Sequence, residues 1–267
     1  MSLFHRAFDL AHFVFPNGGT CLEFGVYTGS TYAYQAQQIL AKYRNSSIIG
    51  FDSWKGLPRE SDGVWAPERH VLGKFSAPKT EVLERLAHLG VEPTDRRFGL
   101  VDGFFSDTLT DELRREIHDV IFINVDVDIH RSTLALLDFV RPLLQPGVVT
   151  YWDDWKDPRD ENVESYGEHL AWSQWYPKQD NLQVETIEVN PVNQRSMLVT
   201  RVGDRVLSPP LPSMSAIRYH AYGLQEIEGS PAPECDPDYE LFLRMKNRLR
   251  GVPLLKPLVR AIRTIMR

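Results

Sequence analysis

The chain has 267 residues, of which 42% are apolar and 25% charged, an ordinary balance for a globular protein of one domain or one domain with an appendage. Its net charge is −6, whereas nucleic-acid-binding proteins are usually basic, so we expect no nucleic-acid partner. The only two cysteines, Cys21 and Cys235, lie far apart and form no metal-binding motif or disulfide framework. This usage fits a reducing compartment, and we expect a cytoplasmic protein.

The first fifteen residues, MSLFHRAFDLAHFVF, are apolar but interrupted by His5, Arg6 and Asp9. They lack a small-residue cleavage site, so the pattern predicts an amphipathic helix and not a signal peptide. Elsewhere no apolar run approaches the length of a membrane span.

Strand-like and helix-like segments alternate along the rest of the chain. The predicted helices cover residues 30–43, 78–90 and 132–144, and Gly90 is a typical helix-ending residue. The predicted strands cover residues 20–26, 46–53, 96–103, 118–128 and 147–154, followed by an antiparallel pair at 181–190 and 194–202. Near-continuous apolar strands alternating with helices indicate a doubly wound α/β fold with a mostly parallel, seven-stranded sheet.

The character of the chain changes after residue 202. Residues 208–213 and 228–240 are rich in proline and loop-like, and residues 240–267 hold eight Lys or Arg against one acid. We therefore divide the chain into a domain at 1–202 and a C-terminal extension at 203–267. The basic, apolar tail suits packing against another subunit, which we favour, or contact with a membrane surface. Pro253 and Pro257 exclude one continuous helix there.

Polar residues follow the predicted strands at the ends where ligands bind in open α/β sheets. The first strand ends in LEFGVYTGST (22–31), whose glycines let a ligand approach the backbone, although a simple tight turn explains them as well. The second ends in GFDSWKGLP (50–58), where Asp52 is placed to accept two ribose hydroxyls. The third ends in LVDGFFSDTL (100–109), again with Asp before Gly.

The fourth and fifth strands end in acid. Asp126 or Asp128, in INVDVDIHRST (123–133), would meet Asp153 and Asp154, in YWDDW (151–155). Clustered carboxylates repel one another unless a cation binds them, and oxygen ligands favour Mg²⁺ or another hard divalent cation. The alternative is that Asp153 or Asp154 caps the next helix.

Five of these motifs, in this order, resemble the macrocin O-methyltransferase family over roughly residues 20–200: LEFGVYTGST, GFDSWKGLP, GFFSDTL, DVDIHRST and YWDDW. The resemblance implies a class I methyltransferase fold and an S-adenosylmethionine- and metal-dependent enzyme that methylates a hydroxyl of a sugar or glycosylated small molecule. The metal ligands it implies are Asp126, Asp153 and Asp154, with Asp128 beside them. The cofactor-binding residues it implies are Glu23, Gly25, Ser30, Thr31, Asp52, Ser53, Trp54, Asp102, Gly103 and Asp126.

Methyl transfer to oxygen is an in-line displacement that needs alignment of the two partners and removal of a proton from the acceptor. Two histidines are candidate bases: His70, in the long loop after the second strand, and His130, just beyond the acidic motif. Asp126 is the remaining option. Trp172 and Trp175 would either stack on a sugar or fill the core, and core is the better interpretation for at least one of them.

Two other functions remain open from the residues alone. An NAD-dependent oxidoreductase has a similar fold, but the full GxGxxG motif is absent and the acidic cluster would be unexplained. A catalytically inactive nucleotide-binding scaffold is the second alternative, and intact Asp126, Asp153 and Asp154 argue against it. We also expect a homo-oligomer, because symmetric dimers are the commonest assembly.

Overall fold

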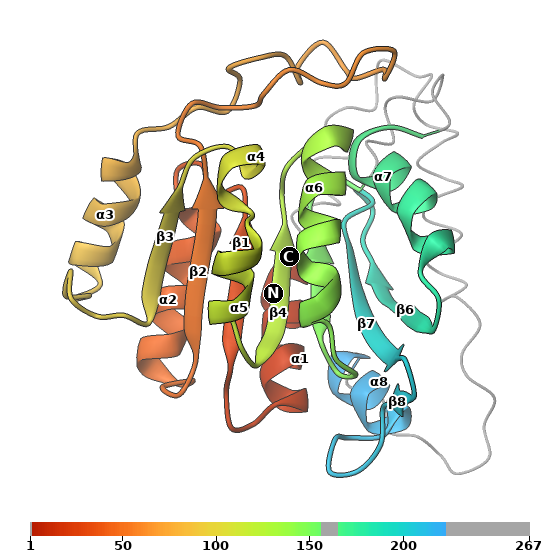
Figure 1. Ribbon diagram of the computed structural model, residues 1–267. Coiled ribbons are helices and arrows are strands. Elements are labelled where there is room, and N and C mark those ends of the chain that lie inside the picture. Colours follow the sequence, from red (N-terminus) through yellow and green to blue (C-terminus); the bar gives the residue numbers. More distant parts are fainter. Residues whose placement is uncertain (1, 156–164, 223–267) are drawn as a thin grey trace, which may run out of the picture. The chain divides into compact units, whose positions relative to one another are not determined.

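The computed structural model describes residues 2–155 and 165–222, which form a central sheet covered by helices on both faces (Figure 1). The strands are β1 (Thr20–Phe24), β2 (Ser47–Asp52), β3 (Phe98–Asp102), β4 (Val120–Val125), β5 (Val149–Trp152), β6 (Leu182–Val189), β7 (Arg195–Val202) and β8 (Arg205–Val206). The helices are α1 (Leu3–Val14), α2 (Ser30–Ala41), α3 (Lys79–His88), α4 (Phe105–Thr108), α5 (Asp111–Glu116), α6 (His130–Val140), α7 (Gly167–Trp175) and α8 (Met214–Tyr222), with short 3₁₀ turns at Arg141–Leu143 and Tyr176–Lys178.

The strand order is β3-β2-β1-β4-β5-β7-β6, and the two-residue β8 pairs with β7. The first five strands are parallel, whereas β7 runs antiparallel to both β5 and β6. The predicted doubly wound, mostly parallel sheet is therefore confirmed, including its antiparallel closing pair. Strands β2 and β3 lie on one side of β1, whereas β4 and β5 lie on its other side. The strand order therefore switches between β1 and β4, and at such a point a crevice opens at the carboxyl ends of the two strands.

Each face of the sheet has its own hydrophobic core. On one face, α1, α2, α3 and α8 pack against residues such as Cys21, Phe122 and Leu198. On the other face, α5, α6 and α7 pack against residues such as Phe24, Ile123 and Trp152. Every residue of β4 is buried because helices cover it on both sides, and this explains why its sequence is apolar apart from Asn124.

Several local predictions are confirmed. The N-terminal helix forms, with the Ser2 side chain accepting a hydrogen bond from the His5 amide, and it buries its apolar face. Helix α3 ends before Gly90, whose φ of +78° suits glycine. Trp175 belongs to the core, 4% exposed, while Trp172 is partly buried and stacks on Tyr176 at a centroid distance of 4.8 Å.

The segment directly after residue 202 is more structured than the sequence indicates. It contains β8 and α8, and the His220 ring of α8 stacks on Phe13 of α1 at 4.1 Å while its Nε2 lies 2.9 Å from Asp9. The described residues, 2–155 and 165–222, accordingly belong to one compact unit. The basic tail at 240–267, and with it the expected subunit or membrane contact, lies outside the described residues.

Candidate active site

A pocket of about 340 Å³ lies at the carboxyl ends of the parallel strands. Residues predicted for the site that line it are Gly25, Asp52, Ser53, His70, Gly103, Asp126, Asp153 and Asp154. Loop residues 53–78, between β2 and α3, supply further lining at Gly56, Leu57, Pro58, Arg69 and Phe75. In Figure 1 this loop passes over the strand ends. The topology thus gathers side chains from five strand ends and one loop around a single cavity.

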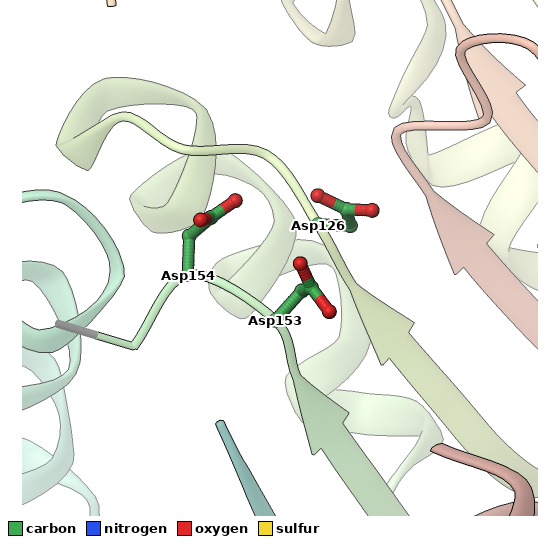
Figure 2. A group of neighbouring side chains, drawn as sticks. All are labelled: Asp126, Asp153 and Asp154. Atoms are coloured by element: carbon green, nitrogen blue, oxygen red, sulfur yellow. The ribbon is translucent and has the colours of Figure 1, made fainter. Parts of the chain in front are cut away.

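Three carboxylates meet at one edge of the pocket. Asp126 directly follows β4, and Asp153 and Asp154 directly follow β5, a strand that lies next to β4 in the sheet (Figure 2). Each offers one oxygen, and these oxygens lie within 4.8 Å of one another. The strands end slightly earlier than the sequence suggests, so the three aspartates sit in the turns and not in the strands.

The electrostatics of this cluster require a positive partner. Burial raises the pKa of Asp126 and Asp154 well above the usual range, and repulsion from the neighbouring carboxylates raises it further. Burial also raises the pKa of Asp153, against the opposing effect of hydrogen bonds from Tyr151 Oη at 2.6 Å and Gln194 Nε2 at 2.5 Å. A hard divalent cation would relieve this repulsion and use the oxygen ligands it prefers, so the residues present fit such an ion.

A histidine from the covering loop reaches the same edge. His70 Nε2 lies 3.0 Å from Asp128 Oδ1, and their side chains are only 3% and 11% exposed. Asp128 has a φ of +61°, which turns the chain sharply between β4 and α6. His70 Nδ1 is buried and has no hydrogen-bond partner among the described residues. The loop thus brings an imidazole with one unpaired nitrogen beside the acidic cluster.

Sequence reasoning missed a further acid, Glu168, in the first turn of α7. It is completely buried, its Oε1 accepts a hydrogen bond from the Val127 amide at 3.2 Å, and its Oε2 has no partner among the described residues. Burial raises its pKa well above the usual range, and repulsion from Asp154 raises it further. The preceding Gly167, at φ +52°, allows the close approach, since an added Cβ would lie 2.3 Å from the Asp128 carbonyl oxygen. The sequence alone carries no signal for this contact.

The turn after β1 is pressed against the turn after β4. A Cβ added at Gly25 would lie 1.8 Å from the Asp126 carbonyl oxygen, and Gly25 has a φ of +84°, so only glycine fits. The Asp52 carboxylate organises the adjoining turns by accepting hydrogen bonds from the amides of Val26, Tyr27 and Trp54 at 2.8, 2.8 and 2.7 Å. This arrangement leaves a narrow, backbone-lined approach to the pocket, as expected for a nucleotide-like cofactor.

The remaining residues implied for cofactor binding lie outside the pocket lining. Glu23 is completely buried beneath α2, where it accepts hydrogen bonds from Thr31 Oγ1 at 2.7 Å and from Gln35. Burial raises its pKa to about 8, against the opposing effect of the Thr31 hydrogen bond. Ser30 is exposed at the start of α2. Glu23 and Thr31 therefore brace α2 against β1 and do not line the pocket.

Trp54 and Asp102 also lie outside the lining and contact each other. Trp54 Nε1 donates to the exposed Asp102 carboxylate at 2.9 Å, and Lys79 Nζ lies 2.7 Å from the same carboxylate. Ser53 and Gly103, their chain neighbours, do line the pocket. The pair therefore joins the ends of β2 and β3 beside the site.

His130 does not line the pocket either. Its Nε2 faces Gln174 Oε1 of α7 at 2.9 Å, and its side chain is buried between α6 and α7. His130 therefore joins α6 to α7. Of the two candidate bases, only His70 lines the pocket.

Comparison with known proteins agrees with this geometry. A family model described as "Methyltransferase domain" matches residues 22–155, which span the first five strands and the acidic cluster. Among solved structures, the calicheamicin methyltransferase CalS11 is similar with a TM-score of 0.59 and 22% identity, covering 73% of this chain and 77% of that one. The O-methyltransferase NovP is similar with a TM-score of 0.57 and 19% identity, covering 73% and 78%.

These two likenesses establish the shared fold. No curated protein sequence matches the chain. Within the described residues, no helix is long and apolar enough to cross a membrane. Because the family match extends over half of the sequence and includes the strand ends that build the pocket, the chain belongs to the methyltransferase domain family.

Proposed function

We propose that this methyltransferase moves a methyl group from S-adenosylmethionine to a hydroxyl of a sugar or glycosylated natural product, with the help of a divalent cation. The observation that carries the proposal is the meeting of Asp126, Asp153 and Asp154 at the edge of the pocket that the strand ends form. An adenosine-type cofactor alone gives no reason to gather three half-buried carboxylates at one point.

The cofactor would occupy the part of the pocket between the β1, β2 and β3 ends. Gly25 and Gly103 present backbone without side chains there, and Asp52 presents a carboxylate whose turn is already fixed by three amides. A carboxylate in this position accepts ribose hydroxyls well. Trp54 and Asp102 would act through Ser53 and Gly103, which line the cavity.

The acceptor would lie between the cofactor and the acidic cluster. Asp126, Asp153 and Asp154 would hold the divalent cation, which would supply Lewis-acid chemistry to a nearby hydroxyl of the acceptor. Tyr151 and Gln194 hold Asp153 in a fixed orientation through their hydrogen bonds. Burial raises the pKa of Tyr151 above its usual range, so its hydroxyl stays a hydrogen-bond donor to that carboxylate.

We assign removal of the acceptor proton to His70. With its proton on Nε2, the imidazole donates to Asp128 and keeps a lone pair on Nδ1, the nitrogen without a protein partner. Asp128 then fixes both the tautomer and the orientation of the ring, as a carboxylate does in other histidine-based catalysts. A proton taken up on Nδ1 would form an imidazolium that the Asp128 carboxylate stabilises.

The acceptor class is supported by the similar structures. CalS11 is described as a TDP-rhamnose 3′-O-methyltransferase and NovP as an O-methyltransferase. The five motifs that resemble macrocin O-methyltransferases indicate the same kind of acceptor. An inactive scaffold would have no need of the buried acids, and the NAD-dependent alternative leaves them without a role.

Calorimetric titration tests the proposal. S-adenosylhomocysteine should bind the wild type, and Mg²⁺ should bind the resulting complex but not the complex of Asp153→Asn. Asp204→Asn, a change at an exposed aspartate in the turn between β7 and β8, is the matched control and should behave as wild type. Failure of the wild type to bind S-adenosylhomocysteine would refute the cofactor, and Mg²⁺ binding that survives Asp153→Asn would refute the metal site.

A further inference from the structure

Helix α6 begins directly after the acidic turn and has no cap of its own. Its N-cap residue, Ile129, offers no side-chain acceptor, so the first amides of the helix need partners from elsewhere. The Glu60 carboxylate supplies them, accepting from the His130 amide at 2.8 Å and from the Arg131 amide at 3.0 Å. A residue seventy positions away thus caps the helix that leaves the metal-binding turn.

Glu60 belongs to the loop that covers the pocket. The base of this loop is closed by hydrogen bonds from the Leu57 amide to Lys74 at 2.8 Å and from the Gly73 amide to Leu57 at 2.9 Å. Gly56 fits only as glycine there, because an added Cβ would lie 2.3 Å from the Lys74 carbonyl oxygen. The residues between, 58–72, extend from this closed base across the strand ends (Figure 1).

Beyond its base the loop contacts α7 and the short segment of residues 128–131. Next to α7, Arg69 donates to Tyr166 Oη at 3.3 Å and the Trp65 ring lies 5.2 Å from the Tyr166 ring.

Two further contacts join the loop to residues 128–131. Glu60 binds the helix start, and His70 binds Asp128 at 3.0 Å. The Glu60 contact joins a carboxylate to the positive end of a helix, where charge-assisted hydrogen bonds are strong. The His70 contact is a single hydrogen bond between side chains. Of the two contacts with residues 128–131, the Glu60 contact has more hydrogen bonds and pairs a charge with the positive helix end, so it is the stronger link between the loop and α6.

We propose that Glu60 is a positioning residue that clamps the covering loop onto α6 and thereby holds His70 against Asp128. This inference rests on the proposed function only for the role of His70 as the base. The contact of Glu60 with α6 does not depend on that function. Because Arg69, His70 and other residues of this loop line the pocket, we infer that loosening the clamp also speeds the release of a bound ligand.

Hydrogen exchange and ligand release test the clamp. In Glu60→Ala we expect exchange of the Leu57, His70 and Gly73 amides about tenfold faster than in the wild type, and S-adenosylhomocysteine release faster by a similar factor, from the loss of charge-assisted bonds. Glu60→Gln keeps an acceptor oxygen and should restore part of both effects. Glu68→Ala, which removes an exposed acid from the same loop, is the control and should change neither.

A spectroscopic reading separates positioning from general stability. The ring resonance of His70 should shift in Glu60→Ala and return toward the wild-type position in Glu60→Gln, while exchange in β4 and β1 stays slow. Unchanged exchange rates of the loop amides and an unchanged His70 ring resonance in Glu60→Ala would overturn the proposal. So would an equal fall in the unfolding temperature of Glu60→Ala and Glu60→Gln with no selective change in the loop. If S-adenosylhomocysteine does not bind the wild type, the proposed function fails, but the exchange and ring measurements still decide the clamp.

Discussion

The buried carboxyl of Glu23 makes the stability of this protein depend on pH. Its pKa is raised by burial from 4.5 to about 8, so the folded state binds a proton that the unfolded state releases. Stability contributed by the neutral form is therefore fully present below about pH 4.5 and is lost as pH rises toward about 8. The free energy of unfolding should fall by about 1.4 kcal/mol per pH unit within this window.

Two other groups must be separated from Glu23. The pKa of His12 is lowered by burial to about 4, so the unfolded state takes up a proton between about pH 4 and pH 6.5, and stability from His12 rises with pH there. Above pH 6.5 this opposing effect ends. Saturating Mg²⁺, bound at the proposed metal site, should remove the contribution of the acidic cluster. Glu168, whose pKa burial also raises, is the same in wild type and Glu23→Gln and cancels in the comparison of the two proteins. The contribution of Glu23 is therefore the difference between them from pH 6.5 to 8 in Mg²⁺.

The assay is urea unfolding at several pH values on wild type and Glu23→Gln. Glutamine is neutral, and its side-chain oxygen can accept the hydrogen bond from Thr31. Its amide nitrogen can donate to Gln35 Oε1, which has no partner among the described residues. Over 1.5 pH units the wild type should lose roughly 2 kcal/mol more than Glu23→Gln. Equal slopes for the two proteins would refute the assignment of a raised pKa to Glu23.

Three further predictions concern the site. His70→Gln should lower the rate of methyl transfer by about 10²- to 10⁴-fold while leaving S-adenosylhomocysteine affinity unchanged, and a comparable loss of affinity would contradict its role as base. Gly25→Ala should abolish cofactor binding, because the added Cβ would lie 1.8 Å from the Asp126 carbonyl oxygen; binding at wild-type strength in calorimetry would show that the two turns are not pressed together. Glu168→Gln keeps the acceptor for the Val127 amide but replaces a carboxyl that can ionise when a cation binds nearby by an amide that cannot. Mg²⁺ affinity should therefore fall by about 10- to 100-fold, and unchanged affinity would place Glu168 outside the influence of the cluster.

The architecture was predictable because local patterns and topology agree. The buried strands are short apolar runs, and α2, α3 and α6 show apolar residues at helical spacing, with Gly90 ending α3. The short helices α4 and α5, and α7, were not predicted. The acidic cluster was predictable for a related reason. Residues just after parallel strands lie at one edge of the sheet, so Asp126, Asp153 and Asp154 had to come close once the strand order was right.

The sequence could not predict the direction in which a side chain points or the contacts between residues far apart in the chain. Glu23 lies inside β1, one residue before its end, so its side chain points under α2 and not out of the crevice. Glu168 and Glu60 reach the site from elements that follow or precede it by tens of residues, and no local pattern indicates those contacts. Helix α8 forms next to a proline-rich stretch because it packs on α1, a tertiary effect that composition hides.

Transfer of labelled methyl from S-adenosylmethionine is the most direct test of metal-dependent O-methylation. The enzyme should be incubated with nucleotide diphosphate sugars and glycosylated macrolides, with Mg²⁺ or with a chelator, alongside Asp153→Asn and Asp204→Asn. We predict one added methyl on a sugar hydroxyl in wild type and Asp204→Asn with Mg²⁺, and none in Asp153→Asn or with chelator. Methyl transfer that continues unchanged in chelator and in Asp153→Asn would contradict the role given to the three aspartates.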